Sequence, residues 1–185
     1  MLFSKVFTAG ALMAATVMAA LTPAQIADSL KKLTDQSQKL QGPAQSITIV
    51  NAPLIIIGQG PLPAIIAGFT EIVTTASAAL SMSSDTPKIT NQADDDLVFD
   101  AFRGFVRAHQ ILLNILIGKS GILTNVPFIG PPVATVLRNV EGVVDAIAFF
   151  LIDTAQGRTG DIESEASSLG DTLDLAIQRY QGLQL

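Results

Sequence analysis

Apolar residues recur along most of this chain at steps of three and four residues, the spacing that lines up side chains on one face of an α-helix. Five segments carry such a stripe. The stripes are, in chain order, Ile26, Leu30, Leu33 and Leu40; Leu62, Ile66, Phe69, Val73, Ala76 and Leu80; Val98, Phe102, Phe105, His109, Leu112 and Leu116; Val133, Leu137, Val140, Val144, Ile147 and Leu151; and Ile162, Ala166, Leu169, Leu173, Ile177 and Tyr180. The sequence therefore predicts five amphipathic helices.

Prolines and glycines mark where these helices begin and end. Pro23, Pro63 and the pair Pro131-Pro132 stand in first-turn positions, where the missing proline N–H costs no hydrogen bond. Helices joined by short connections form an antiparallel bundle. The predicted fold is all-α, with about five helices and one possible extra short helix. The expected stops are Gly42-Pro43 for the first helix, the polar run 81–87 for the second, and Gly118 and Gly121 for the third, which covers residues 93–119.

The segment SITIVNAPLIIIGQG, residues 46–60, fits this scheme least well. Its β-branched residues suit a strand, but Pro53 interrupts either choice and a lone strand has no partner. We expect a short helix after Pro43, followed by an irregular turn through Gly58, Gly60 and Pro61. The residues at helical spacing in this segment are Ile47, Val50, Leu54 and Ile57.

Residues 1–20, MLFSKVFTAGALMAATVMAA, have the pattern of a secretory signal peptide. One cation, Lys5, precedes an uncharged apolar run, and small residues stand at Ala19 and Ala20, where a signal peptidase cleaves. A retained membrane anchor is less favoured, because Thr22, Pro23 and a new amphipathic pattern follow at once. We expect residues 21–185 to form a single domain, secreted or loosely associated with the cell wall.

Charge and cysteine content exclude several classes of function. The chain has 11 Lys and Arg against 16 Asp and Glu, a formal net charge of −5, and removal of Lys5 makes it one unit more negative. Because binding a polyanion needs a basic stripe, nucleic acid is not an expected partner. There is no cysteine, so disulfide and thiol chemistry are excluded and stability must come from packing.

The residues available for catalysis are few. There is a single histidine, and no pattern typical of a zinc site, a nucleophile elbow or a phosphate loop occurs. Successive residues of a helix point about 100° apart, so Asp94, Asp95 and Asp96 cannot converge on one cation and instead match the dipole at a helix start. Asp100, Arg103 and Arg107 read as a solvated edge. We expect no enzymatic activity, no metal and no cofactor.

His109 interrupts an apolar stripe between Phe105 and Leu112, so it should point inward. The imidazole nitrogens in that position need a hydrogen-bond partner. Two interpretations stay open. His109 is either a neutral core histidine bonded to a neighbouring helix, or a hydrogen-bond or charge partner for a ligand carboxylate.

Three windows are nearly free of charge: residues 40–70, 120–137 and 143–152. The first two contain several prolines and glycines, which spoil a spanning helix, so no integral membrane span is predicted; they suit flexible apolar lids over the ends of a bundle. The third, VVDAIAFFLI, is apolar nearly all round and must be buried on several sides or touch apolar matter. An ordinary core would produce the same stripes.

Several longer pieces resemble one family. GQGPLPAIIAGFTEIV, DAFRGFVRAHQILLNILIGKSGILTNVPFIGPPV, VLRNVEGVVDAIAFFLID and AIQRY are together similar to the fungal hydrophobic surface binding protein A family, which includes cell wall galactomannoproteins. The resemblance extends from about Leu21 to the end. It implies a bundle of about five helices and an extracellular or cell wall location. This chain lacks the long Ser/Thr-rich tail and anchor signal of the mannosylated members, so covalent attachment to the wall is not expected.

The family implies two roles: capture of fatty acids, and adsorption to hydrophobic solids with recruitment of secreted polyester-degrading hydrolases. We favour capture of a fatty acid or similar apolar ligand inside the bundle, with surface adsorption as the alternative and a structural cell wall role third. Burial of a sixteen-carbon chain at about 0.8 kcal/mol per methylene would contribute roughly 11 kcal/mol before entropy costs. The residues expected to face a central slot are Phe69, Val73, Phe102, Phe105, His109, Leu112, Ile147 and Phe150.

Overall fold

The computed structural model describes residues 20–124, 126 and 128–183. The predicted signal peptide, apart from its last residue, lies outside this part of the chain. The described residues form five α-helices and three short 3-10 helices, with no strand among them. Their bounds are α1 Pro23–Gln45, η1 Ala52–Ile57, α2 Pro61–Ser81, α3 Gln92–Lys119, η2 Ser120–Leu123, α4 Gly130–Thr154, η3 Gln156–Arg158 and α5 Thr159–Gln181. The predicted all-α bundle is confirmed.

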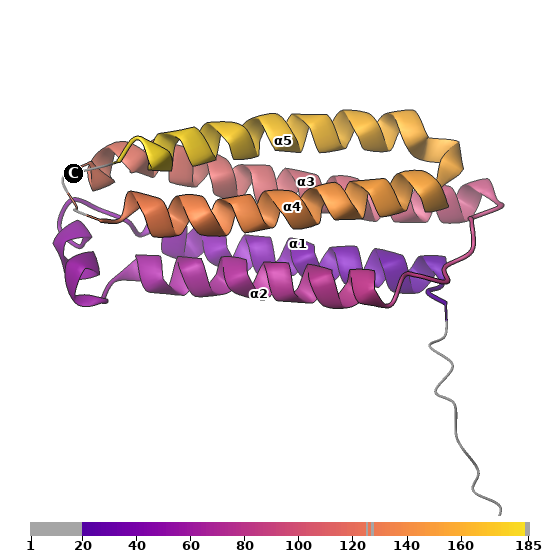
Figure 1. The fold of residues 1–185 in the computed structure, drawn as a ribbon, viewed down its shortest axis with the longest axis horizontal. Helices are drawn as coiled ribbons and strands as arrows, with labels where there is room; N and C mark the ends of the chain where they lie inside the picture. Colours follow the sequence, from indigo (N-terminus) through magenta and orange to yellow (C-terminus); the bar gives the residue numbers. More distant parts are fainter. Residues whose placement is uncertain (1–19, 125, 127, 184–185) are drawn as a thin grey trace, which may run out of the picture.

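The five long helices form a closed ring around a common interior (Figure 1). Each packs against two neighbours, in the order α1, α3, α5, α4, α2 and back to α1. Consecutive helices alternate in direction, as the antiparallel prediction requires. However, α2 and α3 are not ring neighbours, and neither are α3 and α4. As a result α1, α3 and α5 lie side by side in the same direction, and so do α2 and α4 (Figure 1).

Local sequence signals set most helix ends. Thr22 forms a capping box with Gln25, in which the Gln25 N–H donates to Thr22 Oγ1 and the Thr22 N–H donates to Gln25 Oε1. Asn91 caps α3 by accepting from the Asp94 N–H at 2.9 Å. Asp94 and Asp95 lie in the first turn of α3, where the helix dipole favours negative charge, as predicted.

Two boundary predictions were wrong. Helix α1 does not stop at Gly42-Pro43 but continues through Pro43 to Gln45. A proline in the last turn forfeits one hydrogen bond, and burial of Ala44 and Ile47, both 0% exposed, holds the turn in place. The short helix expected directly after Pro43 is a 3-10 helix that begins only at Ala52.

The predicted apolar face of residues 46–60 is also incorrect. Ile47 is buried, but Val50, Leu54 and Ile57 are 87%, 41% and 66% exposed. Asn51 explains the break: its side chain accepts from the Thr48 N–H and donates to the Ser46 carbonyl, which closes a turn where the helix was expected.

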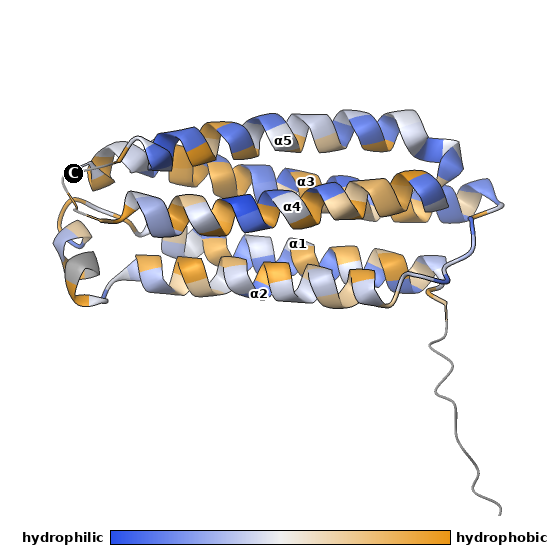
Figure 2. Ribbon diagram, in the orientation of Figure 1, coloured by the Kyte–Doolittle hydropathy of each residue, from blue (hydrophilic) through white to orange (hydrophobic). Residues whose placement is uncertain are grey.

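The five stripes meet inside the ring and form one hydrophobic core. Figure 2 shows apolar and polar segments alternating along each helix, as expected of amphipathic helices. Only Ile66, Val73, Leu80 and Ala166 among the stripe residues are half-buried; the others are buried. Helix α2 is long and apolar enough to cross a membrane by length and composition, with a mean hydropathy of 1.4, and 22% of the tested window is buried inside the bundle.

Candidate ligand-binding interior

An apolar groove opens between α1, α2 and α4, at the end of the bundle where α1 begins and the other two end. Its free space is about 360 Å³, counted up to the open mouth. The enclosed part is only about 30 Å³, far below the roughly 300–1,000 Å³ of sites that hold a small molecule. The lining is apolar except for Ser29, and consists of Leu21, Ile26, Leu30, Leu33, Ala76, Ala79, Leu80, Ile147, Phe150 and Leu151. We call this the α1–α2–α4 groove.

Helix α1 contributes residues both to the groove and to the surroundings of His109. Leu33 lines the groove, and its carbonyl oxygen lies 2.8 Å from the hydroxyl of Ser37, one turn further along α1. The same hydroxyl lies 2.9 Å from His109 Nδ1 on α3. From Ile26 at the mouth to Ser37, α1 rises about 16 Å at 1.5 Å per residue. The groove and His109 therefore lie along the same inner face of α1, with packed core between them.

Aromatic rings enclose His109. The ring centroids of Phe105 and Phe69 lie 5.4 Å and 5.8 Å from the imidazole. Phe69 belongs to α2 and His109 to α3, which are not neighbours in the ring, so they meet in its middle. Burial lowers the pKa of His109 from 6.5 to about 4, and the imidazole is therefore neutral at physiological pH. Its Nε2 has no hydrogen-bond partner in the part of the chain that the structure describes.

The eight residues predicted from the sequence fall into two groups. Phe69, Phe105 and His109 form the aromatic cluster, and Phe102 and Leu112 are buried on the same helix as His109. Ile147 and Phe150 line the groove. Val73 is half-buried on α2. In the cluster the aromatic side chains pack against the imidazole, and the free space lies beside Ile147 and Phe150. That any of these residues contacts a ligand stays a prediction.

Sequence reasoning missed Ser37 and part of the groove. Ser37 follows Leu33 by four residues and precedes Leu40 by three, so its place on an apolar stripe was a usable signal that an inward polar group awaited a partner. Ala76 and Ala79 leave room beside Ile147 and Phe150 because their side chains are small. No pattern in the sequence marks them as groove residues.

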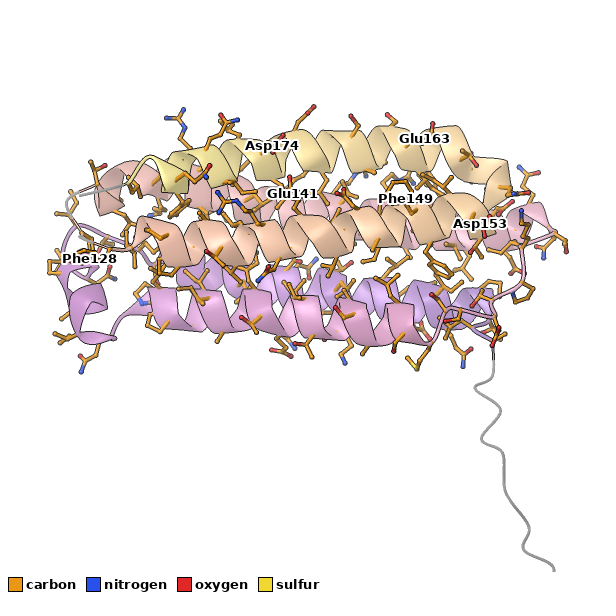
Figure 3. All side chains as sticks on the ribbon, viewed as in Figure 1. Phe128, Glu141, Phe149, Asp153, Glu163 and Asp174 are labelled. Carbon is orange, nitrogen blue, oxygen red and sulfur yellow. The ribbon has the colours of Figure 1, made fainter. Side chains whose placement is uncertain are left out.

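A second, polar groove lies on the outside, between α4 and α5. It has a free space of about 760 Å³ up to its wide mouth, and its lining includes Phe149, Asp145, Glu163 and Asp174. Figure 3 shows Glu141 and Phe149 on α4 beside Asp174 and Glu163 on α5. The pKa of Glu141 is raised by burial first, and then by the neighbouring carboxylates of Asp174 and Asp145. Like charges thus crowd this seam.

Exposed apolar side chains gather at the opposite end from the α1–α2–α4 groove, where α1 ends and α2 and α4 begin. Phe128 is 79% exposed, and Figure 3 shows it at this end of the bundle. A shallow apolar groove of about 670 Å³ lies between Leu62 and Ile66 of α2 and Ile129. We call this surface the apolar end; its other exposed residues are Ile49, Val50, Leu54 and Ile57.

No known family profile matches the sequence, and no curated protein matches it. Two solved structures share the fold. AfMP4p in complex with palmitic acid superimposes with a TM-score of 0.68 at 18% identity, covering 88% of this chain and 99% of that one. Ligand-binding domain 1 of the Penicillium marneffei MP1 protein, complexed with arachidonic acids, gives a TM-score of 0.63 at 13% identity, covering 84% and 98%. This chain therefore shares its fold with two proteins whose structures were determined in complex with palmitic acid and with arachidonic acids.

Proposed function

We propose that this protein captures fatty acids or similar apolar ligands inside its helical bundle, without catalysing a reaction. The observation that carries the proposal is the apolar α1–α2–α4 groove, lined in part by the same inner face of α1 that meets His109, whose Nε2 has no hydrogen-bond partner among the described residues. The two solved structures of the same fold hold palmitic and arachidonic acid, which supports a ligand of this class.

The energetics favour the tail of such a ligand over its headgroup. Burial contributes about 0.8 kcal/mol per methylene, so a sixteen-carbon chain gains roughly 11 kcal/mol before the costs of association. A single neutral hydrogen bond contributes only about 0.5–1.5 kcal/mol. We therefore expect the alkyl chain to supply most of the affinity.

Filling the groove tests this proposal. Ala79 is half-buried and lines the groove, whereas Ala78 is exposed on the same helix. Ala79→Phe should place a ring in the groove. In an assay in which a fatty acid displaces a fluorescent analogue, the Kd of the fatty acid should rise at least about tenfold, or 1.4 kcal/mol. Ala78→Phe is the matched control and should bind like wild type. Native mass spectrometry should also find co-purified fatty acid; a ligand-free protein that displaces no fluorescent fatty acid would contradict the proposal.

A second function, adsorption to hydrophobic surfaces, is favoured by the apolar end. Val50, Ile57 and Phe128 are each more than 60% exposed there, and exposed apolar patches mark contact sites for apolar partners. Val50→Ser combined with Ile57→Ser should reduce retention on polyester or wax. Phe149→Ser is the control, because Phe149 is 74% exposed on the side of the bundle instead. Equal retention of both variants would refute a role for the apolar end.

We further propose that the protein is secreted, or loosely associated with the cell wall, and belongs with the hydrophobic surface binding protein A family. The signal-like residues 1–20 and the resemblance from about Leu21 onward support this. Determination of the amino terminus of protein recovered from culture medium should give a start near Leu21. A start at Met1, or retention inside the cell, would contradict it. Incubating the adsorbed protein with a secreted polyester hydrolase would test whether it recruits such a partner.

A further inference from the structure

The hydroxyl of Ser37 determines which nitrogen of His109 carries a hydrogen. Ser37 Oγ lies 2.8 Å from the Leu33 carbonyl oxygen and 2.9 Å from His109 Nδ1. The carbonyl can only accept, and two oxygens at this distance repel unless a hydrogen lies between them. The single hydroxyl hydrogen of Ser37 is therefore donated to Leu33. Only the lone pairs of Oγ face the imidazole, so His109 Nδ1 is the protonated nitrogen and donates to Ser37.

The other nitrogen of His109 is consequently a bare acceptor. In a neutral imidazole with hydrogen on Nδ1, Nε2 carries a lone pair and no hydrogen. His109 is 0% exposed, and Nε2 has no hydrogen-bond partner. An unsatisfied buried polar atom of this kind costs about 1–3 kcal/mol, and the cost is recovered when a donor reaches it. What fits Nε2 is an O–H or N–H group, whereas a carboxylate, which only accepts, does not fit.

No charged side chain of the described residues is buried beside His109 to alter this preference. Glu141 on α4, Glu165 on α5, and Asp94, Asp96, Arg103 and Lys119 on α3 are half-buried; Asp95 is buried, but four turns away at the start of α3. Tyr180 on α5 is buried, yet it donates its hydroxyl to the Leu116 carbonyl at 3.0 Å, and burial raises its pKa, so it stays neutral. The exposed charged groups on these helices include Lys39 on α1, Glu71 on α2, Arg107 on α3, Arg138 on α4, and Asp171 and Asp174 on α5.

We infer that the interior of the bundle selects apolar ligands whose headgroup donates a hydrogen bond to Nε2 of His109, so that a fatty acid is bound as the protonated acid. Long-chain alcohols belong to the same ligand class, and esters of the same length do not. The inference rests on the proposed capture of apolar ligands and adds the chemistry of the headgroup. His109 is thus a specificity-determining residue, while the alkyl chain supplies most of the affinity.

Binding of a fatty acid then depends on pH. A carboxyl group in water ionises with a pKa of about 4 to 5, so at neutral pH the free ligand is an anion and must take up one proton on binding. Its Kd should rise about tenfold per pH unit above that pKa, hence by close to a thousandfold between pH 5 and pH 8. His109 itself stays neutral throughout this window, because burial lowers its pKa to about 4. An alcohol carries its hydrogen at every pH, so its Kd should not change.

Three ligands with the same chain test the inference: hexadecanoic acid, hexadecanol and methyl hexadecanoate. We expect calorimetric titration of the delipidated protein at pH 7.5 to show the alcohol binding ten- to a hundredfold more tightly than the ester. Titrations in two buffers with different ionisation enthalpies should show one proton taken up per fatty acid and none per alcohol.

Variants locate the effect at His109. His109→Leu, or His109→Phe if the first variant is unstable, should make the alcohol and ester bind equally. Phe99→Leu is the matched control, because it shortens a buried aromatic side chain of the same helix outside the cluster, and it should preserve the preference for the alcohol. If the three ligands bind equally well to wild type, or the acid binds without proton uptake, the inference is wrong while capture stands. If none of them binds, capture itself fails and the inference with it.

Discussion

Acidification should destabilise the ligand-free protein, and a defined part of the loss should trace to His109. The pKa of His109 is about 4 in the folded protein, because burial disfavours the charged form, and 6.5 in an unfolded chain. Between these values the unfolded state binds a proton that the folded state does not. The stabilisation is therefore fully present above pH 6.5 and is lost as the pH falls toward 4.

The size of this effect follows from the two pKa values. Each pKa unit corresponds to about 1.4 kcal/mol, so a difference between 6.5 and about 4 amounts to about 3 kcal/mol. This is a large share of the roughly 5–15 kcal/mol that stabilises a typical domain. At pH 5 about 2 kcal/mol of it should already be gone.

Urea unfolding at several pH values between 4 and 7 measures this loss. Carboxylates also titrate at the lower end of the range, so the informative quantity is the difference between wild type and His109→Leu. The variant lacks the titrating group and leaves Ser37 bonded to the Leu33 carbonyl. We expect the two free energies of unfolding to be similar at pH 7, with the variant becoming the more stable protein as the pH falls. Parallel curves from pH 7 to pH 4 would refute the conclusion that His109 is buried and neutral.

Three further predictions test the packing. In thermal melts, Gly130→Ala should destabilise the protein by about 2–3 kcal/mol, because its Cβ would lie 2.3 Å from the Tyr180 carbonyl oxygen. Gly142→Ala has no atom within 4 Å of its Cβ and should stabilise α4 by up to about 1 kcal/mol. Glu141→Gln should stabilise the protein at pH 7 by up to about 1 kcal/mol, since the raised pKa means that ionisation costs stability there; the gain should vanish below about pH 4. If α2 moves away from α1 to admit a ligand, Gln36→Leu should speed fatty-acid association in stopped-flow measurements, because the Gln36 amide links α1 to Glu71 and Thr75 of α2. Gln41→Leu breaks a hydrogen bond from α1 to α3 instead and should leave the rate unchanged. Equal rates in those two variants would argue against movement of α2.

The sequence predicts the helices well because the spacing of apolar residues within each segment is enough to define its buried face. Leu62, Ile65 and Phe69 recur at helical spacing whatever helix they later meet. The order of the helices in the ring does not follow from the sequence in this way, because a stripe specifies which face is buried but not which neighbour covers it. For this reason the parallel contact between α1 and α3 could not be predicted. The prediction for residues 46–60 was wrong because the Asn51 side chain competes locally with helix formation.

The candidate site was predictable to a similar degree. His109 stands out because it is polar within an apolar stripe, and its inward orientation follows from that. Its partner Ser37 lies 72 residues away on another helix, so only the fold brings the two together. The α1–α2–α4 groove is lined by Ala79 of α2 and Phe150 of α4, and no single stripe contains both residues.

Helix α2 is the part of the bundle best suited to admit a ligand. Phe69 packs against His109, and the interior is too full for a long chain unless some wall moves. Displacing α2 breaks its contacts with α1 and α4 and leaves the other four helices joined through α1, α3, α5 and α4. The preceding turn contains Gly58 and Gly60, whose φ values of 73° and 86° suit glycine, and α2 carries one charged residue, Glu71. Its movement would carry Phe69 away from Nε2 and lengthen the groove along α1, so the wall that opens is also the wall that covers the headgroup site.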